Sequence, residues 1–306
     1  MSFTKREGRK EIMKHYLTID IGGTFIKYSL MDNSYKILEE GKLATEKEPQ
    51  KFLEQVKSIA VKYKDTINGI AACIAGFINP ETGENTDFSV GERFRAYNLK
   101  KELEMIAEVP VILENDSNCA ALGEMVCGAA KNITDFCLLT FGTGIGGAIV
   151  INNKLFRGQH YKAGEAGLML LGYTKDNEQI NGESAGATSV LVKKVSEAIG
   201  EEVDGRYVFG HLCNPVIASI YKTWIYQAAT TVGNMAMIID PEMVLIGGGI
   251  SHEPQFIKDM EDTVYQLYPH LKQYTRISGC QMGNQAGQIG ALYLWLEQNR
   301  RDNGYD

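Results

Sequence analysis

Two similar strand–turn–strand patterns constrain the fold of this 306-residue chain more than any other feature. In segment 17–31, two apolar runs flank a turn that contains Asp20 and a Gly-Gly pair. In segment 136–151, two apolar runs flank the glycine-rich residues 142–147. Short apolar runs bounded by glycine are typical of β-strands joined by tight turns. The order of elements therefore restarts halfway along the chain, which predicts two halves of related α/β architecture.

Helical and strand-like periodicities alternate through the remainder of the chain. Apolar spacing predicts helices at about 50–63, 99–107, 183–199, 213–239 and 286–298, one capped at 115–117 that ends near 127, and one that begins near 253. Strand-like runs cover residues 35–44, 67–74, 109–113 and 243–246. The hydrophobic content of 44% is enough for a well-buried core.

The length of the chain favours two domains over one. We expect residues 14–118 to form a small N-terminal lobe and residues 119–285 to form a larger C-terminal lobe. The last helix, 286–298, is expected to pack back onto the first lobe. Residues 1–13 are polar and basic, and we interpret them as a disordered leader.

Composition excludes several classes of partner. The net charge is −7, whereas general nucleic-acid binders are usually basic, so DNA and RNA are not expected partners. No apolar run reaches membrane-spanning length, and no signal-peptide core is present. Six cysteines without a C-x-x-C pair are typical of buried, reduced thiols, which indicates a cytoplasmic protein.

The first glycine turn has the residue types that bind phosphate. Glycines at 22 and 23 allow the backbone to approach phosphate oxygens, and turn amides and the Thr24 hydroxyl can donate hydrogen bonds to them. Asp20 would lie at the strand end, near the metal ion that accompanies phosphates. The same residues also fit a plain β-hairpin with a Gly-Gly turn.

The second and third glycine turns are ambiguous when each is taken alone. Residues 142–147 contain G-x-G-x-x-G, but they open a strand at 148–151, whereas the dinucleotide fingerprint must open a helix. Neither of the first two turns ends in the G-K-[ST] of a Walker A loop. Residues 247–249 lie between a strand and a helix, where a flat adenine ring could approach the backbone.

Taken together, the three turns resemble those of the ROK family of sugar kinases and repressors. The matching segments are 20–24 with Lys27, 141–147 and 241–251, in the family's order and spacing. The resemblance implies an actin-like ATPase fold, a duplicated ribonuclease H-like α/β architecture with two lobes and an interlobe cleft. It also implies binding of ATP and of Mg²⁺, which would be held through ATP, with Asp20 as a candidate ligand. The implied ATP-binding residues are Asp20, Gly22, Gly23, Thr24, Lys27, Gly142, Thr143, Gly144, Gly248 and Gly249.

The resemblance also implies a catalytic base. Phosphoryl transfer to a hydroxyl needs a carboxylate that accepts the proton, and the Asp of the family's Asn-Asp-x-Asn motif has that role. Here the motif is 115–118, so Asp116 is the expected base and Asn115 a sugar ligand. On local sequence alone, an ordinary helix N-cap is the favoured interpretation of this segment.

Two glutamates and a glycine complete the expected sugar site. Glu165 matches the Glu of the family's Glu-x-Gly-His, but Leu168 replaces the His. Glu183 matches the Glu that closes the family's zinc segment, and Gly76 resembles the glycine beside the sugar. Residues 169–182 contain neither Cys nor His, so we expect no structural zinc. Either glutamate could instead be a solvated surface charge, and Gly76 an ordinary strand-end glycine.

The resemblance therefore predicts ATP-dependent phosphorylation of a hexose, at the C6 hydroxyl. Glucose is the preferred substrate, N-acetylmannosamine the next and a β-glucoside the third. The open alternatives are a non-catalytic sugar-sensing member of the family, and a cytoskeletal or chaperone ATPase of the same fold. A homodimer is also possible, because the family is often dimeric.

Overall fold

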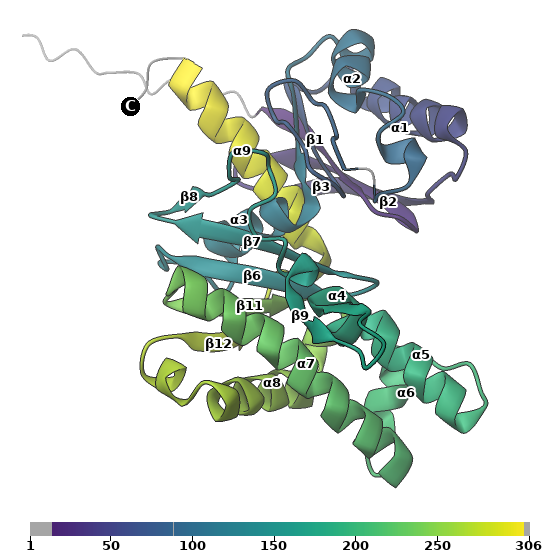
Figure 1. Ribbon diagram of the computed structural model, residues 1–306. Helices are drawn as coiled ribbons and strands as arrows, with labels where there is room; N and C mark the ends of the chain where they lie inside the picture. The colour runs from purple at the N-terminus through teal and green to yellow at the C-terminus, as the bar shows by residue number, and fades with distance from the viewer. Residues whose placement is uncertain (1–13, 88, 303–306) are drawn as a thin grey trace, which may run out of the picture.

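The computed structural model describes residues 14–87 and 89–302, and the leader expected at 1–13 lies outside this part of the chain. Two five-stranded sheets lie one above the other, with helices between them and on their outer faces (Figure 1). Among the described residues, no helix is both long and apolar enough to span a membrane.

The first sheet has the strand order β3-β2-β1-β4-β5. Its strands are β1 (His15–Ile21), β2 (Phe25–Asp32), β3 (Ile37–Ala44), β4 (Gly69–Ile74) and β5 (Val111–Asn115). The first three form an antiparallel meander, while β4 and β5 run parallel to β1. The carboxyl ends of β1, β4 and β5 therefore share one edge of the sheet, where the Asp20 turn and the Asn115-Asp116 pair lie.

The second sheet repeats this order as β8-β7-β6-β11-β12. Its strands are β6 (Phe136–Phe141), β7 (Ile145–Ile151), β8 (Lys154–Leu155), β11 (Met243–Gly247) and β12 (Arg276–Gly279). As in the first sheet, the first three are antiparallel neighbours and the last two run parallel to β6. The predicted duplicated α/β fold is confirmed.

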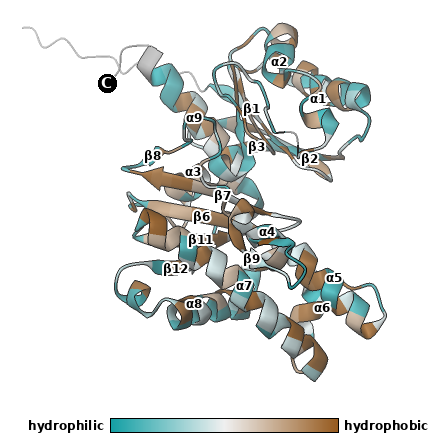
Figure 2. Ribbon diagram, in the orientation of Figure 1, coloured by the Kyte–Doolittle hydropathy of each residue, from teal (hydrophilic) through white to brown (hydrophobic). Residues whose placement is uncertain are grey.

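Both sheets are covered on both faces, which explains their almost continuously apolar central strands. On the first sheet, α1 (Pro49–Tyr63) and α2 (Leu99–Ala107) cover one face and α9 (Ala286–Asp302) the other. On the second sheet, α3 (Asp116–Cys127) covers the face opposite to the large helical layer. That layer consists of α4 (Gly182–Gly186), α5 (Thr188–Ile199), α6 (Gly205–Gly210), α7 (Pro215–Ile239) and α8 (Pro254–Leu267). Figure 2 shows the hydrophobic colour concentrated on strands such as β6 and β7.

Helices α3 and α9 cross between the two sheets at glycines. A Cβ atom on Gly123 of α3 would lie 2.1 Å from the Ala286 carbonyl oxygen, and one on Gly290 of α9 would lie 1.8 Å from the Cys119 carbonyl oxygen. Each helix therefore brings its bare backbone against the backbone of the other. No side chain fits at either position in this arrangement.

The structure corrects several expected element boundaries. The helix expected at 183–199 is two helices, because Ala187 adopts an extended conformation and its carbonyl oxygen accepts a hydrogen bond from the Trp224 indole at 3.0 Å. The third strand begins at Ile37, because Tyr35 has a positive φ in a turn. The short strands β8, β9 (Leu170–Tyr173), β10 (Gln179–Asn181) and β12 were missed. Cys127 and Cys213 are exposed, contrary to the expectation of buried thiols.

We predict that Gly290→Ala destabilises the protein. Alanine is favoured over glycine in a helix by about 1 kcal/mol, but overpacking a contact this close costs more, so we expect a net loss of about 2 kcal/mol. Urea unfolding monitored by circular dichroism measures this difference.

The matched control is Gly210→Ala at the end of α6, where an added Cβ would meet no atom within 4 Å. We expect this variant to stay within about 0.5 kcal/mol of the wild type. Equal stability of the two variants would contradict the tight helix crossing.

Candidate active site

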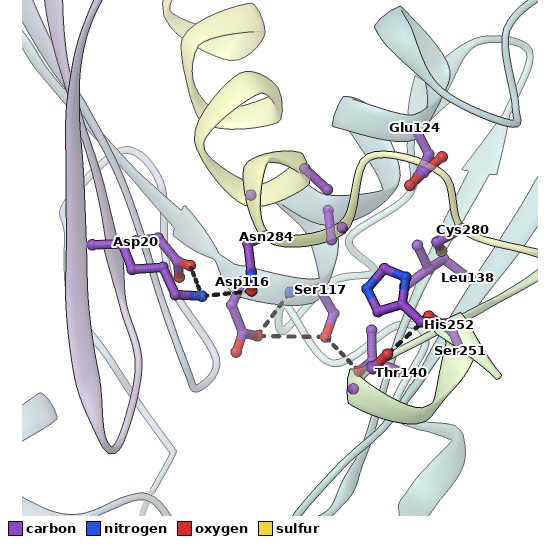
Figure 3. A pocket seen from close by; sticks show the side chains of 18 residues that line it. Asp20, Asp116, Ser117, Glu124, Leu138, Thr140, Ser251, His252, Cys280 and Asn284 are labelled. Carbon is purple, nitrogen blue, oxygen red and sulfur yellow. Dashed lines mark hydrogen bonds and ion pairs between the residues drawn. The ribbon is translucent and has the colours of Figure 1, made fainter. Parts of the chain in front are cut away.

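A cavity of about 270 Å³ lies between the two sheets, beside the helix crossing (Figure 3). It gathers the end of β1, the N-termini of α3 and α9, the end of β6 and the loop after β11. Of the residues expected from the sequence, it is lined by Asp20, Lys27, Asp116, Gly248 and Gly249. Gly22, Gly23, Thr24, Gly142, Thr143 and Gly144 do not line it, and lie in the two hairpin turns.

Asp20 and Lys27 form one side of the cavity. They are directly paired residues of β1 and β2, and the Lys27 Nζ lies 3.6 Å from Asp20 Oδ2. Lys27 also donates to Asn284 Oδ1 at 2.9 Å, which connects the hairpin to the start of α9. Burial raises the pKa of Asp20, while the Lys27 charge opposes this shift. The pair therefore offers one carboxylate and one cation to a ligand in the cavity.

The first glycine turn is held from two sides. The Thr45 hydroxyl donates to the Gly22 carbonyl oxygen at 2.8 Å, and Arg93 donates to the Gly23 carbonyl oxygen at 3.1 Å. The Gly22 amide closes the hairpin onto the Phe25 carbonyl oxygen at 3.0 Å. The exposed Thr24 completes the turn.

Asp116 is the first residue of α3, and Asn115 caps that helix by accepting a hydrogen bond from the Asn118 amide. Asp116 Oδ1 accepts from the Ser117 amide at 2.7 Å, which fixes the carboxylate at the cavity wall (Figure 3). Burial raises the pKa of Asp116, and the nearby negative charge of Asp20 raises it further. A partly exposed carboxylate with a raised pKa has the properties of a general base.

Two helix N-termini face the same cavity. Asp116 and Ser117 begin α3, and Ala286 and Gly287 begin α9. The N-terminus of a helix carries a partial positive charge and unpaired N–H groups, which favour an anion. The cavity can therefore accept phosphate despite the carboxylates in its wall.

Asn115 and Gly76 are brought together, as expected for a shared site. The Asn115 side chain donates to the Gly76 carbonyl oxygen at 3.1 Å. Gly76 has a φ of +116°, and a Cβ there would lie 2.4 Å from the Asn85 side chain. Only glycine fits this strand end, so the backbone conformation and the contact with Asn85 explain why position 76 is a glycine.

Glu165 lies in an acidic cluster that sequence analysis found only in part. Burial raises the pKa of Glu165 to about 7, and the charges of Asp116, Asp87 and Glu183 add to the shift. Asp87 is only 7% exposed, and its Oδ1 accepts hydrogen bonds from the amide and hydroxyl of Ser89. Because Asp87 stands in a loop without a recognisable motif, the sequence offered no signal for it.

Glu183 contacts the second glycine turn. Its Oε2 accepts a hydrogen bond from the Ile145 amide at 3.2 Å, and a Cβ on Gly144 would lie 2.3 Å from the same oxygen. Ser189 of α5 donates to the carbonyl oxygens of Gly142 and Thr143. Glu183 therefore joins the acidic cluster to the turn, and Gly144 provides the space that this contact needs.

The third glycine turn approaches the second sheet closely. Gly248 has a φ of +94°, and a Cβ there would lie 2.0 Å from the Phe141 carbonyl oxygen. Gly249 has open space beside it. Its lack of a side chain leaves open space at this point of the cavity wall.

Glu124 is a buried residue of the site that sequence reasoning missed. Its Oε1 accepts from the amides of Gln281 and Met282 at 2.9 and 2.8 Å, and its Oε2 accepts from the Ala129 amide at 2.8 Å. The carboxylate thus fastens the loop after β12, which lines the cavity, to the end of α3. A lone Glu inside an otherwise apolar helix was the available signal.

The described residues contain no cluster of three or more His, Cys, Asp or Glu side chains that could hold a metal ion. The segment 169–182 forms the β9–β10 hairpin instead. Leu168, in the position of the family's His, is 57% exposed. The absence of structural zinc stays a prediction.

Two sheets of the same strand order around a polar cavity, with a helix crossing between them, define an actin-like ATPase fold. The chain belongs to the ROK family, whose family model matches residues 16–298. The resemblance deduced from the glycine turns is confirmed.

Named relatives of this chain act on several sugars. A β-glucoside kinase of Listeria monocytogenes is 32% identical over 295 residues, which cover 92% of this chain and 97% of that protein. A glucokinase of Halalkalibacterium halodurans is 27% identical and covers 92% of this chain and 95% of its own length. A Listeria monocytogenes structure proposed to be an N-acetylmannosamine kinase superposes with a TM-score of 0.82 at 30% identity, over 93% of this chain and 99% of that one.

We predict that Glu165→Gln changes how stability depends on pH. Burial raises the pKa of Glu165 from 4.5 to about 7, so between these values the folded protein retains a proton that the unfolded chain has released. The stability that this proton contributes is complete below about pH 4.5 and is lost as pH rises through about 7. Relative to the wild type, the variant should therefore gain about 1–3 kcal/mol between pH 5 and pH 8.

Urea unfolding at a series of pH values measures this difference. Glu197→Gln, on an exposed side chain of α5, serves as the control and should stay within about 0.5 kcal/mol of the wild type at each pH. A pH-independent difference for Glu165→Gln would contradict the raised pKa of Glu165.

Proposed function

We propose that this protein phosphorylates a gluco-configured sugar at its C6 hydroxyl. The protein is an ATP-dependent sugar kinase, as its family membership and its kinase relatives indicate. The single observation that supports the proposed chemistry best is Asp116, a carboxylate with a raised pKa at the N-terminus of α3, facing the cavity between the sheets.

In the proposed reaction, Asp116 accepts the proton of the sugar hydroxyl as its oxygen attacks the γ-phosphorus of ATP. Asn115, Glu165 and Glu183 bind other hydroxyls of the sugar, and Gly76 allows the sugar to approach the strand end. The turns at 22–24 and 142–144 hold the phosphates, and Gly248 and Gly249 lie against the adenosine. The N-termini of α3 and α9 stabilise negative charge near the transferred group.

The residues present fit a magnesium ion bound with ATP. Asp20 and Asp116 are carboxylates that line the cavity, and Mg²⁺ prefers oxygen ligands of this kind. When bound, Mg²⁺ neutralises part of the charge on the phosphates. Asp20 is the residue that we propose to hold it, with Lys27 close enough to limit the excess negative charge.

We propose that residues 14–118 with the last helix form one lobe and residues 119–285 the other, and that they close on the ligands. Closure would exclude water from the γ-phosphate. We also place the protein in the cytoplasm, which supplies ATP and keeps thiols reduced, since all six cysteines are free. A homodimer stays a prediction.

A coupled kinase assay tests the function and the choice of substrate. Glucose, N-acetylmannosamine and the β-glucoside cellobiose should be compared by kcat/KM at fixed Mg²⁺-ATP. Glucose is the substrate preferred from the sequence, but the β-glucoside kinase relative and the exposed Leu168 make the β-glucoside a specific second candidate.

Each outcome of this assay decides a separate point. Phosphorylation of only cellobiose would keep the kinase class and overturn the preference for free glucose. ATP hydrolysis without a need for sugar would indicate a non-kinase ATPase. Sugar binding without phosphoryl transfer would indicate a sugar sensor.

We predict that Asp116→Asn lowers kcat by about 10²–10⁴-fold, because the amide keeps the shape of the side chain but cannot accept the proton. Binding of sugar and ATP, measured by calorimetry, should stay near the wild-type values. The control is Asp65→Asn, on an exposed residue after α1, which should leave kcat unchanged. An Asp116→Asn enzyme within about tenfold of the wild type would rule out Asp116 as the base.

A further inference from the structure

A buried ion pair joins the two sheets behind the active site. Arg157 Nε lies 2.7 Å from Glu114 Oε2, and the Glu114 side chain is only 1% exposed. Glu114 belongs to β5 of the first sheet, whereas Arg157 follows β8 of the second. The pair therefore connects a strand of the first sheet to the loop that follows a strand of the second, between residues 43 positions apart in the chain.

The other oxygen of Glu114 is directed at the start of α3. Oε1 accepts hydrogen bonds from the Asn115 amide and from the Asn118 side chain, both at 2.9 Å. These two residues flank Asp116 within the catalytic motif. Glu114 thus holds the backbone around the proposed base with one oxygen and Arg157 with the other.

Arg157 stands at the base of the turn that leads to Glu165. Its carbonyl oxygen accepts from the Ala163 amide at 3.1 Å, which closes the turn. Gly164 follows with a φ of +96°, packed so closely on β7 that a Cβ would lie 2.8 Å from the Gly147 carbonyl oxygen. Glu165 comes next, and its distance from Asp116 depends on where this turn sits.

We propose that Arg157 is a positioning residue that sets Glu165 at the correct distance from Asp116, through the buried carboxylate of Glu114. This inference rests on the proposed function, because it assigns Glu165 to the sugar and Asp116 to the proton. A guanidinium suits the task because its planar, permanently charged group binds a carboxylate in a defined geometry. Arg157 touches neither ligand in this account and acts only through the two loops that it joins.

Arg157→Ala should raise the KM for sugar about 10–100-fold, because a displacement of about 1 Å in a binding group has effects of that size. The KM for ATP should change less than about twofold, since the nucleotide turns contact neither member of the pair. Lys154→Ala is the matched control. Like Arg157, Lys154 lies on the segment around β8 and lines a second, outer cavity, but it forms no ion pair with Glu114.

Chemical rescue separates positioning from a general structural role. A cavity of about 440 Å³, lined by residues that include Lys154, Tyr293 and Glu297, reaches Arg157 from outside. Methylguanidinium should enter the space left in Arg157→Ala and restore the KM for sugar at millimolar concentration. It should restore nothing in Glu114→Gln/Arg157→Ala, which lacks the carboxylate.

The double variant also keeps the test valid if Arg157→Ala folds poorly. An unpaired buried carboxylate is destabilising, but Gln at position 114 is neutral and still accepts from Asn115 and Asn118. The double variant should therefore fold and show the same selective loss of sugar affinity. An unchanged KM for sugar in a folded variant, or an equal rise in both KM values without rescue, would overturn the proposal.

Amide hydrogen exchange tests the placement without any enzyme activity. Residues 163–168 should exchange faster in the double variant than in the wild type or in Lys154→Ala, because the turn has lost its link to β5. If the wild type phosphorylated no sugar, the proposed function would fail, yet this exchange measurement would still test whether the Arg157–Glu114 pair holds the turn at 163–168. Unchanged exchange of these residues would overturn the proposed role of Arg157.

Discussion

The crossing of α3 and α9 is the contact on which the rest of the structure depends. Helix α3 follows the last strand of the first sheet but covers the second sheet, and α9 follows the last strand of the second sheet but covers the first. The two halves thus exchange helices, and Gly123 and Gly290 allow the exchanged helices to meet at their backbones. This close crossing aims both helix N-termini into the cavity between the sheets, where their partial positive charges oppose the carboxylates of Asp20 and Asp116.

The electrostatics of the cavity follow from that geometry. A chain with a net charge of −7 must bind a polyanion beside several carboxylates. Lys27 is the cation that lies against Asp20, and the N-termini of α3 and α9 add partial positive charge at the cavity wall. Burial raises the pKa values of Asp20, Asp116 and Glu165, and the charges of neighbouring carboxylates add to the shift for Asp116 and Glu165. Raised pKa values of this kind are typical of carboxylates in functional sites.

Much of the fold could be predicted from the sequence because its signals are local. Glycine turns, apolar strands and the 115–117 helix start depend on neighbouring residues, and the sheets confirmed them. The features that were missed depend on contacts between distant segments. Ala187 breaks a periodic helix where Trp224 binds its carbonyl oxygen, and Glu124 accepts hydrogen bonds from the amides of Gln281 and Met282, which are far away in the chain. Asp87 joined the acidic cluster through a loop that carries no pattern, so only the tertiary structure could identify it.

The duplicated sheets differ at a pair of positions that border the cavity. Asp20 and Thr140 occupy equivalent places, each next to last in the strand before a glycine turn, and both line the cavity. Across the hairpin, Asp20 pairs with Lys27, whereas Thr140 pairs with Gly146. A Cβ on Gly146 would lie 2.5 Å from the Ser117 hydroxyl, so the missing side chain admits the N-terminus of α3. The β1–β2 hairpin therefore supplies the charge pair, and the β6–β7 hairpin leaves space for the N-terminus of α3, which carries Asp116. A side chain at position 146 would clash with Ser117, and a glycine at position 27 would remove the cation beside Asp20, so the proposed site depends on this difference between the two hairpins.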